Sequence, residues 1–219
     1  TGRWDPYGPV HKGLRRRHAM LLLRLGSTDF SGDVSELLAE LRTHLSMATM
    51  HLLDEEVHIH KVLEQRYPGA ARTLERQHGE HRASLEALER EIRRLEMTSE
   101  RQASSGHALY LAFSRFVADD LQHMSHEEEV TWPLLCRLFS DEELAAIEAD
   151  IVTSLPPALA GAFMSTMVAA VNTPQRIMML HGLRAQAPAE AYAALMDEVI
   201  LPVLSEAERM PLRQAGLLA

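Results

Sequence analysis

Hydrophobic residues recur every three or four positions over four long stretches of the chain, which is the pattern of amphipathic α-helices. These stretches predict helices over residues 10–25, 35–65, 70–97 and 107–139, with residues 98–106 as a loop. Gly26 follows the first stretch, Pro68 and Gly69 follow the second, and the fourth is expected to bend near Pro133. Because short loops join the stretches, we expect an all-α fold, an antiparallel up-down-up-down four-helix bundle.

The two ends of the chain have a different character. Residues 1–9 hold two prolines and two glycines and are predicted to form an extended arm. Residues 141–219 are predicted to form shorter helices, interrupted where prolines recur: Pro156, Pro157, Pro174, Pro188 and Pro202. The sequence therefore predicts an arm, a bundle over residues 10–140, and a C-terminal helical extension packed on that bundle.

Polar residues interrupt the apolar face of each predicted bundle helix at a comparable height. The second and fourth helices each carry a His-x3-Glu pair, whose members share one helix face: His51 with Glu55, and His123 with Glu127. The third helix contributes His78 and the first contributes His11. Burying an ionised carboxylate without a partner costs several kcal/mol, so these residues need a common compensating charge. A shared metal centre would supply it.

Other polar residues lie near this level of the predicted bundle. Five side chains are predicted to be additional ligands or to contact the ligands: His81, His18, His44, His58 and Asp120. His81 is a candidate for a sixth nitrogen ligand, and His18 is the alternative to His11 on the first helix. The remaining histidines are expected at the surface or at helix caps: His60, His107, His126 and His181.

Composition narrows the classes of function. The formal net charge is −9 and no basic patch dominates, which argues against a nucleic-acid partner. No apolar stretch approaches the ~20 residues that span a bilayer, so no membrane partner is expected. The single cysteine, Cys136, excludes a disulfide framework and is typical of the reducing cytoplasm. The Met-rich segment after residue 141 predicts either core packing or the face of a homodimer.

This constellation resembles the hemerythrin-like (HHE cation-binding) family over residues 10–140. The resemblance depends on the following residues: His11, His51-x3-Glu55, Gln77-His78 and His123-x3-Glu127-Glu128. It implies a four-helix bundle with a non-haem di-iron centre, oxo- or hydroxo-bridged, whose ligands are His11, His51, Glu55, His78, His123 and Glu127. In that scheme the two glutamates bridge the ions and the histidines are terminal ligands. Manganese and zinc accept the same kinds of ligand.

The chain departs from the oxygen-carrying hemerythrins in two places. Those proteins have His-x3-His on the third helix, whereas Leu74 and Arg82 stand four residues from His78 here. They have His-x4-Asp on the last helix, whereas Glu127 occupies the +4 position here. Fewer nitrogen ligands leave more open coordination. We therefore predict a protein that binds or senses oxygen, peroxide or nitric oxide, and reversible oxygen carriage does not follow from the resemblance.

Two other classes of function fit the same residues. A di-metal oxidase, peroxidase or hydrolase would use metal-bound water or peroxide and would show steady turnover. A metal-dependent interaction or signalling protein would pass a change in the bundle to the C-terminal helices. We favour a metal-binding protein over an enzyme, and the sequence alone leaves this choice open.

Overall fold

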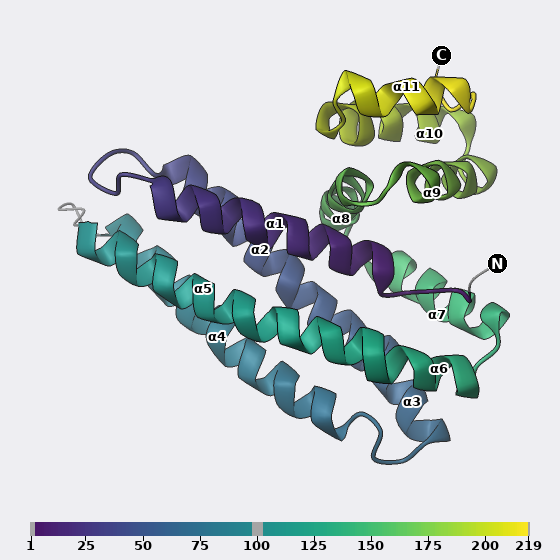
Figure 1. Ribbon diagram of the computed structural model, residues 1–219, viewed down its shortest axis with the longest axis horizontal. Helices are drawn as coiled ribbons and strands as arrows, with labels where there is room; N and C mark the ends of the chain where they lie inside the picture. Colours follow the sequence, from purple (N-terminus) through teal and green to yellow (C-terminus); the bar gives the residue numbers. More distant parts are fainter. Residues whose placement is uncertain (1–2, 98–102, 219) are drawn as a thin grey trace. The chain divides into compact units, whose positions relative to one another are not determined.

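The chain folds into α-helices joined by short connections (Figure 1). This computed structural model describes residues 3–97 and 103–218, and no β-strand occurs within them. The all-α class predicted from the hydrophobic periodicity is confirmed. Within the same residues, no helix combines the length and the apolar character needed to cross a membrane.

The long helices lie close to the predicted ranges. They are α1 (Gly8–Ser27), α2 (Ser35–Asp54), α4 (Arg72–Met97) and α5 (Ala103–His126). The helix begun by α2 continues through a π-helical turn, η1 (Glu55–His60), into α3 (Lys61–Arg66). The helix begun by α5 continues in the same way through η2 (Glu127–Thr131) into α6 (Trp132–Leu138).

The fourth long helix begins earlier than its sequence pattern predicts. Helix α5 starts at Ala103 rather than at residue 107, so the predicted loop over residues 98–106 is wrong for its last four residues. Residues 98–102 of that loop lie outside the described part of the chain. The reason is a tertiary contact: Gly106 packs directly against the buried ring of Phe30, which holds this polar stretch in the helix.

The C-terminal region consists of shorter helices, as the spacing of its prolines predicts. They are α7 (Asp141–Ser154), α8 (Pro157–Ala170), α9 (Thr173–Gln186), α10 (Ala189–Leu195), the turns η3 (Met196–Ile200) and η4 (Leu201–Val203), and α11 (Glu206–Gln214). Proline occupies the first turn of α8 and of α9, where its missing N–H costs nothing. Asn172 caps α9 by accepting a hydrogen bond of 3.0 Å from the N–H of Gln175.

The chain divides into two compact units. The first contains the chain up to Tyr7 together with Arg17–Ser154, and the second contains Gly8–Arg16 together with Leu155–Ala219. The core of the first unit is built by leucines and phenylalanines of α1, α2, α4 and α5, among them Leu21, Leu41, Leu88 and Phe113. The second unit has its own core around Val168, Leu180, Ile200 and Leu212.

Contacts within the first unit show that neighbouring helices run antiparallel. The pairs that join them are Arg24–Glu40 and His18–His44 between α1 and α2, Arg42–Glu96 and Glu56–His78 between α4 and the helix begun by α2, and His78–His123 and His81–Asp120 between α4 and α5. Between each two helices, the residue number of the contact rises on one helix as it falls on the other, as expected for antiparallel neighbours. This register brings the polar sections of these helices to one level.

Residues 3–7, the N-terminal arm, are held in the first unit by hydrogen bonds and by the burial of Tyr7. The Arg3 guanidinium donates hydrogen bonds to the carbonyl oxygens of Cys136 (2.8 Å) and Phe139 (2.6 Å), and the Trp4 indole N–H donates to Glu148 (2.6 Å). Tyr7, at the end of the arm, is 1% exposed and packs in the apolar cluster that includes Ile59, Leu63 and Leu135. The arm therefore places a phenol ring in the core.

Replacing Gly106 by Ala is expected to lower the free energy of unfolding by about 1–3 kcal/mol, because the new methyl group would overlap the Phe30 ring. Chemical denaturation measures this change. Gly79→Ala, in the interior of α4, is the matched control, since no atom lies within 4 Å of its new methyl group. That variant should gain about 0.5–1 kcal/mol from helix propensity. A loss of the same size in both variants would contradict the Phe30 contact.

Candidate metal centre

Each of the two long helices that carry His-x3-Glu contains a π-helical turn that begins at the glutamate. Turn η1 starts at Glu55 and turn η2 starts at Glu127. Before each glutamate the helix is α-helical, so His51 and Glu55 share one face, as do His123 and Glu127. After it, the wider i→i+5 turn changes which residues face inward. Such turns are rare and occur frequently at functional sites.

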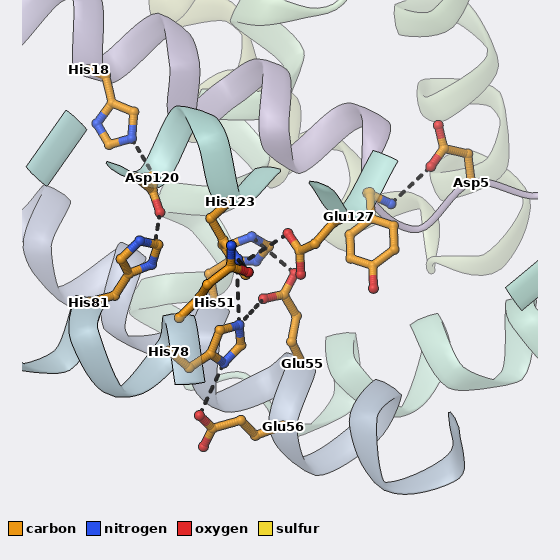
Figure 2. A network of polar contacts seen from close by, with 12 residues as sticks. Asp5, His18, His51, Glu55, Glu56, His78, His81, Asp120, His123 and Glu127 are labelled. Carbon is orange, nitrogen blue, oxygen red and sulfur yellow. Dashed lines mark hydrogen bonds and ion pairs between the residues drawn. The ribbon is translucent and has the colours of Figure 1, made fainter. Parts of the chain in front are cut away.

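Four side chains from α4 and the two π-containing helices point toward one another (Figure 2). Glu55, His78, His123 and Glu127 each offer one ligand atom, and these atoms all lie within 4.8 Å of one another. The His78 Nε2 atom lies 3.5 Å from Glu55 Oε2, and His123 Nε2 lies 3.4 Å from Glu127 Oε2. Two imidazoles and two carboxylates at this spacing can hold a metal ion.

A second set of ligand atoms overlaps the first. His51, Glu55 and Glu127 also present atoms within 4.8 Å of one another, and His51 Nε2 lies 3.2 Å from Glu55 Oε1. Both glutamates belong to both sets. Glu55 and Glu127 therefore offer carboxylate oxygens to each of the two groups that could hold a metal ion.

The far sides of two imidazoles are fixed by hydrogen-bond acceptors. His78 Nδ1 lies 3.0 Å from the Glu56 carboxylate, and His123 Nδ1 lies 3.1 Å from the amide oxygen of Gln77. Since both acceptors require an N–H on Nδ1, neutral rings present the lone pairs of their Nε2 atoms to the centre. These two Nε2 atoms are 3.1 Å apart. A proton or a metal cation held between these two atoms would satisfy this contact.

Burial strengthens the repulsion between the two carboxylates of the centre. Glu55 is 2% exposed, Glu127 is 0% exposed, and the two carboxylates would repel each other strongly in the interior. Burial, followed by the charges of His123 and His60, lowers the pKa of His78 to about 2, so its ring stays neutral. Because the His78 ring is neutral, it carries no positive charge that could balance the negative charges of Glu55 and Glu127.

A second buried polar network adjoins the centre. His18 Nε2 lies 2.7 Å from Asp120 Oδ2, and His18 Nδ1 lies 2.9 Å from His44 Nε2. The other Asp120 oxygen lies 3.5 Å from His81 Nδ1, and the His81 ring is 4.9 Å from the His123 ring, centroid to centroid. Burial opposes ionisation of Asp120, but the hydrogen bond and charge of His18 hold its pKa below the usual range. Asp120 thus forms a hydrogen bond with the His18 imidazole on α1 and lies beside the His81 imidazole on α4 (Figure 2).

The other predicted site residues occupy varied positions. His18, His44 and His81 lie in the network beside the centre rather than in either set of ligand atoms, and direct ligation by His81 stays a prediction. His58 is half-buried, and its charge acts on Asp54. His11 is fully buried on the part of α1 that belongs to the second unit, and its role as a ligand stays a prediction.

The hydrophobic periodicity does not predict the position of two residues near the centre. His60, expected at the surface, is only 3% exposed, and its ring lies 4.7 Å from the His78 ring, centroid to centroid. An α-helix would place positions +3 and +4 on the face of Glu55, but the π-turn places position +5, His60, there. The other such residue is Tyr7. Burial, and then the charges of Glu127 and Glu55, raise the pKa of Tyr7 well above its usual range, so its phenol stays protonated.

Asp54, which directly precedes Glu55, gives the metal-free protein a pH dependence. Burial raises the pKa of Asp54 to about 6, whereas an unfolded aspartate titrates near pH ~4. The folded state therefore favours the protonated carboxyl, and this stabilisation is present below pH ~4 and is lost as the pH rises through about 6. We expect Asp54→Asn to raise the free energy of unfolding by about 1–2 kcal/mol at pH 8 and to leave it nearly unchanged at pH 4.

Urea denaturation of the metal-free protein at both pH values measures this difference. The control is Asp119→Asn on the exposed face of α5, which should change the stability little at either pH. An equal gain for Asp54→Asn at pH 4 and pH 8 would contradict the raised pKa.

Comparison of the chain with models of protein families finds no match, and comparison with curated protein sequences finds none either. The buried histidine and glutamate clusters have donor atoms that are compatible with metal binding.

Proposed function

We propose that the chain is a hemerythrin-like four-helix bundle whose centre holds two iron ions and binds or senses a small ligand such as oxygen, peroxide or nitric oxide. One observation carries the proposal. Two overlapping sets of buried ligand atoms share Glu55 and Glu127, and imidazole Nε2 atoms face each other across them. These carboxylate oxygens and imidazole nitrogens together would bind two cations.

The donor set favours iron as the metal. Neutral imidazoles and carboxylates suit divalent iron, manganese and zinc, and a mixed set with open positions is typical of non-haem iron that binds a small ligand. The fixed Nδ1 atoms of His78 and His123 support the same assignment, because metal-binding histidines almost always donate their other N–H to a carboxylate or carbonyl oxygen. Glu55 and Glu127 would bridge the ions.

Helix register supports His11 as a further ligand. His18, His44 and Asp120 are joined by hydrogen bonds on three helices of the first unit. A step of seven residues, about two α-helical turns, leads from these residues to His11, His51 and Glu127 respectively. We therefore propose His11, with His51, as a terminal ligand of one ion.

The test is the metal content and visible spectrum of protein purified from iron-rich medium. We expect about two iron ions per chain and an absorption band that changes when azide, or oxygen after reduction, is added. Fewer than one metal ion per chain and a spectrum indifferent to both additions would overturn the proposal. Sustained turnover of peroxide with an added reductant would instead identify a di-metal peroxidase built on the same ligands.

A further inference from the structure

His60 is a buried imidazole whose polar atoms have no role in holding the fold. The residue is 3% exposed, and neither of its ring nitrogens hydrogen-bonds to any residue in the described part of the chain. Two carboxylates lie four residues from His60 along the helix, and both have other partners. Glu64 accepts hydrogen bonds from the N–H groups of Gly69 and Ala71, both at 2.7 Å, and Glu56 lies 3.0 Å from His78 Nδ1. Buried polar groups are normally satisfied, so this exception calls for a partner outside the chain.

The backbone directs this imidazole toward the metal centre. Turn η1 runs from Glu55 to His60, and its wider turn rotates His60 toward the side of the helix that carries Glu55. The His60 ring also lies against the His78 ring, at 4.7 Å between centroids with an interplanar angle of 40°. His60 therefore neighbours the ligand atoms on two different helices.

His60 nevertheless stands outside the ligand sets. Neither group of ligand atoms within 4.8 Å of one another includes it. Its ring nevertheless contacts the ring of His78, so a molecule bound to the ions beside His78 would lie next to His60. Whatever its tautomer, an imidazole carries at least one N–H that can donate a hydrogen bond.

We propose that His60 is the hydrogen-bond donor that holds a small anionic ligand at the metal pair. The inference rests on the proposed metal centre and adds the residue that selects its ligand. An anion bound to the ions would accept the His60 N–H, which gives this buried group its partner. Neutral ligands that cannot accept such a bond would gain nothing from it.

The experiment compares azide affinity, by absorption titration of the iron-loaded protein, across three variants. His60→Met keeps the volume and removes the donor, and it should weaken azide binding about tenfold or more, as expected for a hydrogen bond to a charged group. His60→Gln restores an N–H donor and should recover most of the affinity. His107→Gln, at an exposed position of α5, is the control and should bind azide like the wild type.

Metal content, measured separately for each protein, distinguishes the two proposals. If the wild type holds no metal, the proposed function fails. If His60→Met keeps its metal and binds azide as tightly as the wild type, His60 does not hold the anion. If His60→Met loses metal, His60 is a metal ligand and the inference is also wrong.

A measurement on the wild type covers the case in which His60→Met does not fold. The metal–azide stretching frequency of the loaded protein should differ between H2O and D2O, because the bound azide accepts an exchangeable N–H. An identical frequency in both solvents would overturn the inference.

Discussion

Replacing Glu127 by Gln is expected to lower the metal affinity by at least about a hundredfold and to leave one metal ion or fewer per chain. Glu127 is completely buried and belongs to both sets of ligand atoms. An amide of the same size has one oxygen and no charge, so it cannot bridge two cations. Since losing a group that merely supports a ligand costs 10–100-fold in affinity, losing a bridging ligand should cost more. Titration with ferrous iron under anaerobic conditions measures the affinity.

Without metal, the same substitution should not weaken the protein. Removing one of two facing buried carboxylates relieves repulsion, so the metal-free Glu127→Gln protein should be as stable as the wild type or more stable by about 1–3 kcal/mol. Glu129→Gln, two residues further along and exposed, is the control and should keep both metal ions. A metal-free Glu127→Gln protein that is destabilised yet still binds two ions would show that Glu127 is structural.

Adding ferrous iron to the metal-free wild type is expected to raise its melting temperature by at least about 10 °C. An ion present at a thousand times its dissociation constant stabilises the folded state by about 4 kcal/mol. In a chain of this length, 1 kcal/mol corresponds to about 2–4 °C. Ions bound at the two sets of ligand atoms would also offset the repulsion between Glu55 and Glu127. Calorimetry with and without metal measures the shift.

Two controls identify the source of this stabilisation. Magnesium prefers oxygen ligands in an octahedral arrangement and should raise the melting temperature little at a centre rich in imidazole. A protein with both His78→Ala and His123→Ala should show little shift with iron. An equal shift with magnesium, or in that double variant, would mean that the ions bind elsewhere on this acidic chain.

Much of the fold follows from hydrophobic periodicity. The 3.6-residue period over long stretches predicts α1, α2 and α4 to within a few residues, because burying one face of a long helix dominates its local preferences. Prolines locate the starts of α8 and α9 because proline suits the first turn of a helix. The start of α5 is missed because the Gly106–Phe30 contact joins residues far apart in the sequence.

The centre is predictable for a similar reason. Histidine and glutamate on the apolar face of a helix conflict with burial, and that conflict marks positions 51, 55, 78, 123 and 127 in the sequence. The structure brings these five side chains together in two overlapping sets. Their function as ligands is what the metal experiments test.

His60 and Tyr7 could not be found in this way. A period of 3.6 residues assigns His60 to the exposed face of the helix. The π-helical turn that begins at Glu55 changes this assignment, and the sequence pattern does not predict that turn. Tyr7 lies in an arm without periodicity, and its place in the core depends on contacts that Arg3 and Trp4 make far along the chain. Glu55 followed by His60 at the +5 position is the signal to look for once a π-turn is known.

The most direct measurement is anomalous X-ray diffraction from crystals of the iron-loaded protein, with data collected on both sides of the iron absorption edge. Two peaks are predicted, both in contact with Glu55 and Glu127, one beside His51 and the other beside His78 and His123. A map with no iron peak among these residues, from crystals that contain iron by elemental analysis, would contradict the metal centre.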